Sequence, residues 1–415
     1  ECMLITQELS IETELPIFQI ESFVVEVRPN EHIKCKMYGI LKTNGIRGLV
    51  YLNEEGTDIS IKYKEDSIFR GVAEDIKINS VANIHHFELT SYSYSKKLDR
   101  EKKTELFQDI NESYEELIKY SSRKYAGNII ANIKDIKVEK PILCYKETAW
   151  EFIKRMAGSL NTFIYPDTVT KSPNIWVGLR EGENISKEDI ILESIQLEKH
   201  NDNDGIIYAF KSYISYKIGD ELKDSGKNLT VYEKRAEFNK GELIFYYLAT
   251  DRKYLSKKVE PFENEEIIGL SLIGKAKKCE NEKIYISLDA DEGKALYPFD
   301  WYPETGNGLY AMPEVGSKVE LYVYGANKGE MYAVRCRDSR SDDKDISLLE
   351  VSKESKLSLS EANITFQKED ILTAGDKHIS MIGARDLSIN AEKKISLKAR
   401  NIRLKSRDEM VFVSK

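Results

Sequence analysis

The chain has 415 residues, of which 41% are hydrophobic and 32% charged, so it is long enough for two to four ordinary globular domains. A net charge of -8 argues against non-specific nucleic-acid binding as the main task, and no apolar run approaches the length of a membrane span. The five cysteines are scattered and form no C-x-x-C pair. This excludes the common zinc and redox motifs and fits a reducing compartment.

The first hundred residues predict a β-barrel. Apolar and polar side chains alternate in several short runs, and turn residues separate them. The clearest runs cover residues 33–39, 68–78 and 86–94. Short strands at this spacing are typical of a barrel, which we place at residues 1–100.

Residues 101–200 predict a helical or mixed insertion. Ser113 is a candidate N-cap for a helix over 113–120, with Glu116 three positions later, as a capping box requires. A stronger helix follows Thr148 and covers 149–157. Four apolar residues lie on one of its faces, namely Trp150, Ile153, Met156 and Ala157.

Two further β regions follow the insertion. Residues 201–262 contain alternating runs that predict the completing part of a second barrel. Residues 263–340 contain five or so short strands and one long loop, a pattern typical of an OB-fold barrel.

The last segment, residues 341–415, repeats an apolar–x–apolar unit every seven or eight residues. Polar turns separate the units, so each predicts a short strand that cannot bury its own apolar face. Three chains wound into a prism would bury these side chains on a common axis. A single-chain solenoid or a small ordinary sheet is the alternative, but single-chain β-helices need longer turns. The predicted trimer core consists of Leu357, Leu359, Ile364, Phe366, Ile379, Met381, Leu387, Ile389, Ile395, Leu397, Ile402, Leu404, Met410 and Phe412.

The sequence carries no motif for catalysis. We find no G-x-S-x-G, P-loop, H-E-x-x-H or dinucleotide fingerprint, and the five histidines do not have ligand spacing. We therefore predict no catalytic, cofactor-binding or metal-binding residues.

A basic run lies within the repeats, with no acidic residue among its members: Lys393, Lys394, Lys398, Arg400, Arg403, Lys405 and Arg407. It fits contact with an anionic surface, such as a membrane or cell-wall polymer. A solvated outer face of the prism is the alternative, and it is the interpretation that we prefer.

The order of these parts resembles the VgrG family and the hub-and-spike proteins of contractile phage tails. Residues 68–76 read IFRGVAEDI and are similar to the family's F-x-G-x-V strand. Residues 147–157 read ETAWEFIKRMA and resemble its E-T-D-W-E-F-L-x-R-L-A helix. Residues 302–319 resemble the P-x-v-G-d-e-V stretch of its OB domain.

This resemblance implies a mainly β homotrimer. Two tube-adaptor barrels per chain would join a hexameric tail tube to an intertwined β-helix or β-prism spike that pierces the target cell envelope. The implied partners are tail tube and baseplate proteins, with no nucleic acid and no cofactor. The chain would be assembled in the bacterial cytoplasm and delivered to the target cell surface within a particle. A phage tail, a phage-tail-like bacteriocin, an extracellular particle and a type VI secretion apparatus all remain open.

Two departures from the family refine these expectations. Residues 338–345 are too few to hold the lysozyme domain of some phage spikes, and the tail lacks the H-x-H iron site of some needles. We therefore expect a separate PAAR-like capping protein or effector at the C-terminal end, with truncation of the chain as the alternative. The alternatives to a puncturing hub are a cell-wall or polysaccharide-degrading enzyme and a receptor-binding fibre on a β-helical stalk.

Overall fold

The protein divides into two compact units, residues 1–342 and 343–415. In the first unit, the computed structural model describes residues 2–4, 8–42, 56–134, 136–200, 203–224, 226–259, 262–288, 293–303, 312–326 and 328–337. In the second unit it describes residues 347–352, 355–359, 364–367, 391, 393–396, 398–403, 405, 407 and 409–411.

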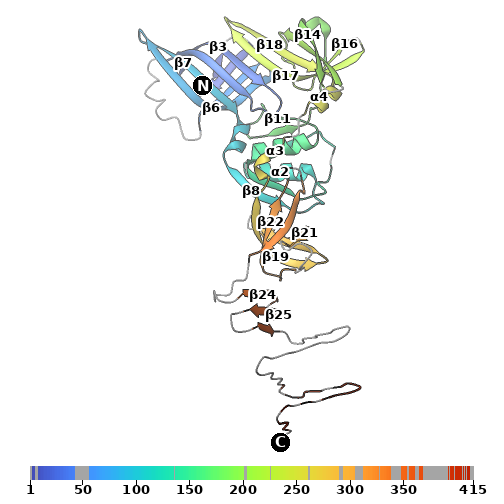
Figure 1. The fold of residues 1–415 in the computed structure, drawn as a ribbon. Coiled ribbons are helices and arrows are strands. Elements are labelled where there is room, and N and C mark those ends of the chain that lie inside the picture. Colours follow the sequence, from blue (N-terminus) through green and yellow to red (C-terminus); the bar gives the residue numbers. More distant parts are fainter. Residues whose placement is uncertain are drawn as a thin grey trace. The chain divides into compact units, whose positions relative to one another are not determined.

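A 13-stranded sheet dominates the first unit (Figure 1). Its strands run in the order β1 (Cys2–Leu4), β2 (Leu9–Thr13), β5 (Asp58–Tyr63), β6 (Asp66–Val81), β7 (Ile84–Ser93), β4 (Lys34–Leu41), β3 (Ile17–Val27), β17 (Lys227–Asn239), β18 (Glu242–Thr250), β15 (Asn203–Ser212) and β14 (Ile191–His200). The short strands β13 (Asn184–Ile185) and β16 (Glu221–Asp224) pair beside β17.

The two predicted β regions meet at the β3–β17 pair. These strands are antiparallel, from Lys234 opposite Val27 to Asn239 opposite Ser22. The rings of Phe23 and Phe238 stack across the pair, 5.4 Å between centroids, and one apolar core continues through both regions. The strands of residues 1–100 and 201–262 therefore share one sheet, which β14 joins from the end of the predicted insertion.

The insertion has its own apolar core, built around two helices (Figure 1). It contains α2 (Tyr114–Arg123), α3 (Ala149–Ser159), the 3-10 helix η2 (Tyr94–Asp99), and strands β8 (Lys102–Phe107), β9 (Ile129–Ala131), β10 (Ile142–Thr148), β11 (Ile164–Pro166) and β12 (Ile175–Val177). Both helices begin with a full capping box, at Ser113 with Glu116 and at Thr148 with Glu151. Both predicted helices are confirmed. The predicted apolar face of α3 is also buried.

The OB-type barrel is confirmed. Five strands close on themselves, in the order β19 (Ser271–Glu280), β20 (Lys283–Leu288), β21 (Pro298–Tyr302), β23 (Met331–Cys336) and β22 (Lys318–Val323). The remaining helical elements are η3 (Lys187–Asp189), α4 (Arg252–Lys258) and η4 (Glu265–Ile267).

In the second unit, β24 (Ser347–Ser352), β25 (Ser355–Leu359) and β26 (Ile364–Gln367) form an antiparallel sheet. The predicted units 357–359 and 364–366 fall on β25 and β26. Ile395, Ile402 and Met410 are described farther along the chain. The other predicted core positions lie outside the described residues, namely Ile379, Met381, Leu387, Ile389, Leu397, Leu404 and Phe412.

Candidate functional site

A histidine whose side chain is 9% exposed joins the large sheet to the helical insertion. His32 lies in the turn between β3 and β4, and its ring packs on Trp150 of α3 with 4.0 Å between centroids. Its Nδ1 lies 2.8 Å from Ser95 Oγ, and its Nε2 lies 2.9 Å from Asp99 Oδ2. The Thr148 hydroxyl, which caps α3, donates to the other Asp99 oxygen at 2.7 Å. We call His32, Ser95, Asp99 and Thr148 the joint.

A neutral imidazole satisfies every hydrogen bond of the joint. An ionised Asp99 can only accept, so Nε2 carries the proton and Nδ1 accepts from Ser95. Ser95 then accepts from Ser93, whose oxygen accepts the Ile33 amide. A second proton on His32 would reverse this chain and leave a buried hydroxyl without an acceptor.

Burial and hydrogen bonding act on the two titratable groups of the joint in different ways. Burial lowers the pKa of His32, against the opposing effect of Asp99. Burial alone would raise the pKa of Asp99, but hydrogen bonds from His32 and Thr148 and the nearby Lys96 lower it to about 2. Both groups therefore stay in the states that the hydrogen bonds need at neutral pH.

Ser95, His32 and Asp99 have the relative order of an acyl-transfer triad. Such a triad needs a nucleophile that a substrate can reach. The Ser95 side chain is buried, with only 1% of the residue exposed, and its oxygen is held by Ser93 and His32. The geometry therefore fits a structural joint between two parts of the first unit.

We expect acid to weaken the joint. Since the folded-state pKa of His32 is lowered, below about pH 6.5 the unfolded chain takes up a proton that the folded chain resists. The free energy of unfolding should fall between pH 7 and pH 5, and His32→Gln should reduce that fall. Urea unfolding at both pH values measures the difference. His86→Gln on β7 is the control, and an equal pH dependence in wild type and His32→Gln would contradict this role.

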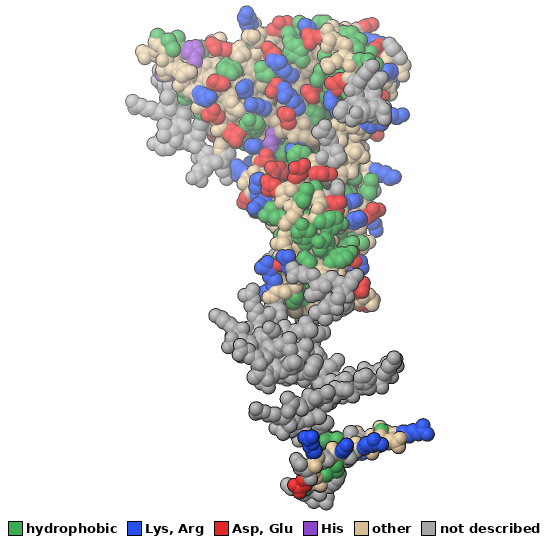
Figure 2. All heavy atoms as spheres, in the orientation of Figure 1, with side chains coloured by type: hydrophobic (Ala, Val, Ile, Leu, Met, Phe, Trp, Pro, Cys, Tyr) green, Lys and Arg blue, Asp and Glu red, His purple; other side chains and the backbone are tan. Residues whose placement is uncertain are grey.

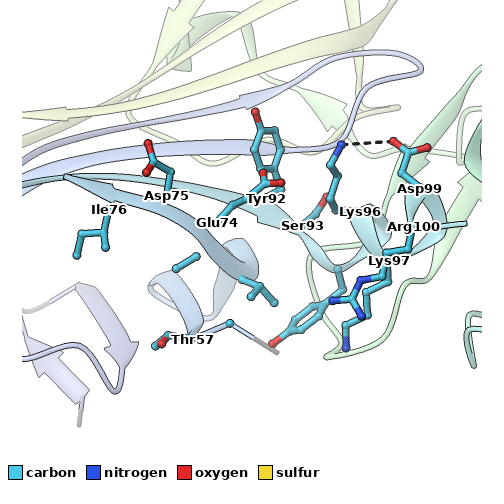
Figure 3. Close-up of a pocket in the computed structure, with 14 residues that line it drawn as sticks. Thr57, Glu74, Asp75, Ile76, Tyr92, Ser93, Lys96, Lys97, Asp99 and Arg100 are labelled. Atoms are coloured by element: carbon cyan, nitrogen blue, oxygen red, sulfur yellow. Dashed lines mark hydrogen bonds and ion pairs between the residues drawn. The ribbon is translucent and has the colours of Figure 1, made fainter. Parts of the chain in front are cut away.

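A cavity of about 560 Å³ lies beside the joint, between β6, the end of β7 and η2 (Figure 3). Lys96, which lines it, reaches Asp99 across 3.5 Å. The described lining residues include three cations and three carboxylates, namely Lys96, Lys97, Arg100, Glu74, Asp75 and Asp99. This balance selects neither an anionic nor a cationic ligand.

A buried ion pair fixes α3 to β10. The Arg155 guanidinium donates two hydrogen bonds to Glu147, at 2.8 and 2.7 Å, and a third to the Leu143 carbonyl at 2.8 Å. Both side chains are at least nine-tenths buried. Two of the residues in the ETAWEFIKRMA stretch are thus explained by a bidentate contact that locks helix to strand.

A second buried carboxylate holds the end of the OB barrel. Glu320 of β22 is almost fully buried and accepts a hydrogen bond from Ser271 Oγ at 2.5 Å. Its other oxygen accepts from Arg337, and Arg335 lies 3.8 Å away. These contacts fix the path of the chain where it leaves β23.

The described side chains of the repeat segment are exposed in the single chain. Ile395 is 52% exposed, Ile402 55% and Met410 44%. Among the described residues, no cluster of His, Cys, Asp or Glu could hold a metal ion. A search of the same residues finds no helix that is long and apolar enough to cross a membrane.

Comparison with solved structures shows which known proteins share this fold. The Escherichia coli c3393 protein is a type VI secretion component with similarity to the T4 phage tail proteins gp27 and gp5. It matches with a TM-score of 0.56 and 10% identity, over 78% of this chain and 98% of its own. The Francisella PdpA–VgrG complex matches with a TM-score of 0.55 and 10% identity, over 88% of this chain and 78% of that one. The chain therefore has the hub-and-spike fold of type VI secretion and phage tail proteins.

The sequence itself carries less of this signal. No family model and no curated protein matches it. The resemblance to VgrG and phage tail hubs rests on the order of the parts, and the fold confirms it. Structural neighbours of this kind are tail and spike proteins.

Sequence reasoning missed the joint and the Glu320 contacts. His32 and Asp99 are 67 positions apart, and nothing in the local pattern pairs them. Asp99 and the capping residue Thr148 are 49 positions apart, so this contact leaves no local signal either. The spacing of Glu147 and Arg155, eight positions across a strand–helix junction, was visible but not distinctive.

Proposed function

We propose that the chain is the trimeric hub and puncturing spike of a contractile injection system. The observation that carries this proposal is the uncovered apolar surface of the repeats. Ile395, Ile402 and Met410 stand at the apolar positions of successive units, yet each is close to half exposed in one chain. Two further copies, wound around a common axis, would bury all three positions and leave the polar turns in solvent.

The edge of the large sheet supports association of the hub as well. Strand β14 ends the sheet and pairs on one side only, with β15. Leu192, Ile195 and Leu197 are 50–57% exposed. Their partners across the strand pair are Phe210, Tyr208 and Ile206, and the first two belong to the core side of the sheet. The apolar face of the sheet therefore extends onto β14, where these three side chains are exposed. A second copy of the chain that packs against β14 would cover them.

The proposed action is mechanical. A contracting sheath would drive the tube forward, and the force would pass through the hub into a narrow spike. Buried bidentate and hydrogen-bonded contacts suit this load, since Arg155, Glu320 and His32 each tie separate elements of the first unit together. No covalent step is needed.

The proposed partners follow from this role. Tail tube and baseplate proteins would contact the hub, and a capping protein or effector would cover the C-terminal end of the spike. The chain would be assembled in a bacterial cytoplasm and carried to the target cell envelope in the particle.

The test compares two lysine substitutions on β14. Ile195→Lys places a charge among the exposed apolar side chains of β14, whereas Gln196→Lys places one on the opposite face of the same strand. We expect Ile195→Lys to weaken trimer formation, and particles carrying it to lose killing of target cells. Gln196→Lys should do neither. The proposal fails if both variants assemble and kill like the wild type, because the exposed apolar side chains of β14 would then have no partner in the particle.

A further inference from the structure

A band of positive charge lies in the second unit. Seven basic side chains and no acidic one occur between residues 393 and 407, although the whole chain has a net charge of -8. All seven are described and exposed. Figure 2 shows the Lys and Arg side chains gathered on this last described stretch. We call residues 393–407 the basic band.

Alternation along the apolar–x–apolar units directs these charges outward. Lys394 and Lys398 flank the unit 395–397 and share the parity of Ser396, opposite the apolar positions. Arg403 lies at the centre of the unit 402–404, and Lys405 follows with the same parity. If the apolar positions face a common core, these four cations face solvent.

We propose that the basic band is a docking surface for the headgroup phosphates of an anionic membrane. The inference rests on the proposed trimeric spike, which presents three copies of the band around one axis. Headgroup phosphates would then be the groups that the spike contacts at the target surface.

The composition of the band favours a lipid surface over a nucleic acid. Residues 393–411 contain no aromatic side chain, so there is no platform on which bases could stack. After Asp408 and Glu409, Val411 lies at the centre of the unit 410–412, so it faces outward in the proposed prism, and it is 66% exposed. Cations with an outward apolar side chain nearby suit a membrane interface, where headgroups meet acyl chains.

Multivalency makes the effect measurable. Each Lys or Arg close to an anionic leaflet adds to the attraction, and the contribution falls off within a Debye length, roughly 10 Å at about 0.1 M salt. Three bands on one spike act together, so binding should be strong at low salt and should weaken steeply as salt is added.

The experiment measures co-sedimentation of the full chain with lipid vesicles. One set of vesicles contains phosphatidylcholine alone, and the other contains added phosphatidylglycerol. The band variant combines Lys394→Gln, Lys398→Gln, Arg403→Gln and Lys405→Gln. The matched control removes four exposed charges from the first unit, through Lys36→Gln, Lys77→Gln, Lys275→Gln and Lys277→Gln. The native mass of each protein is measured first, so a failure of the trimer is seen separately from a failure of the band.

We expect wild type and control to bind the anionic vesicles. The band variant should bind them at least about a hundredfold more weakly. Equal binding to the neutral vesicles, or undiminished binding by a trimeric band variant, would overturn the proposal. Binding to duplex DNA as tight as to vesicles would also overturn it, since the band would then recognise any polyanion. If the band variant does not trimerise, the wild-type salt titration decides, because salt-independent binding contradicts an electrostatic dock.

Discussion

Replacement of Ile395 by Asp should abolish the ordered spike. In the proposed trimer, this substitution puts three carboxylates at one level of a shared apolar core. Burial of a charge without a partner costs several kcal/mol or more, and three like charges add mutual repulsion. We expect loss of the trimer and of the cooperative unfolding transition of the repeat segment. Native mass measurement and thermal unfolding followed by circular dichroism report both effects.

Ser396→Asp is the matched control. Ser396 is the next residue along the chain and lies between the two apolar positions of the same unit. Its side chain faces outward in the proposed prism, so the added carboxylate stays in water, beside Lys394 and Lys398. We expect a trimer of unchanged stability. Equal tolerance of Asp at positions 395 and 396 would show that Ile395 does not face a core.

The second large effect is expected at the buried ion pair of the insertion. Arg155→Met removes the cation but leaves Glu147 buried between β10 and α3, with its main hydrogen-bond donor gone. Breaking a buried pair in this way costs about 3–5 kcal/mol. Urea unfolding of the full chain at neutral pH should show this loss in the free energy of unfolding.

The double variant separates loss of the pair from loss of burial. Arg155→Met combined with Glu147→Met replaces both charges by apolar groups of similar length, and we expect it to recover part of the lost stability. Arg28→Ala breaks an exposed pair with Glu26 and should cost no more than about 1 kcal/mol. If Arg155→Met costs as little as Arg28→Ala, the insertion does not depend on this contact.

Local patterns in the sequence predicted local structure well. Ser113 and Thr148 begin their helices through capping boxes that can be recognised from residues three positions apart. Period-two alternation indicated OB strands such as β19 and β20, because each of these shows its pattern within six to ten residues. The hub-and-spike class followed from the order of the parts.

Long-range pairing could not be predicted in the same way. Val27 and Lys234 lie opposite each other in the β3–β17 pair, but more than 200 residues separate them and many strands have similar patterns. The joint is hidden for a related reason. A histidine in a turn and an aspartate at the end of a 3-10 helix look like ordinary surface residues until the fold brings them to 2.9 Å. The proposed packing of a second copy on β14 leaves even less trace, since exposed apolar positions such as Ile195 fit the same alternation as buried ones.

The central claim is that three copies of the chain associate, and the mass of the purified 415-residue chain in solution tests it most directly. One chain has a mass of 47.7 kDa. We predict a species of three chains at micromolar concentration, in which the repeat segment resists proteolysis. A monomer with an equally protected repeat segment would contradict the trimeric spike.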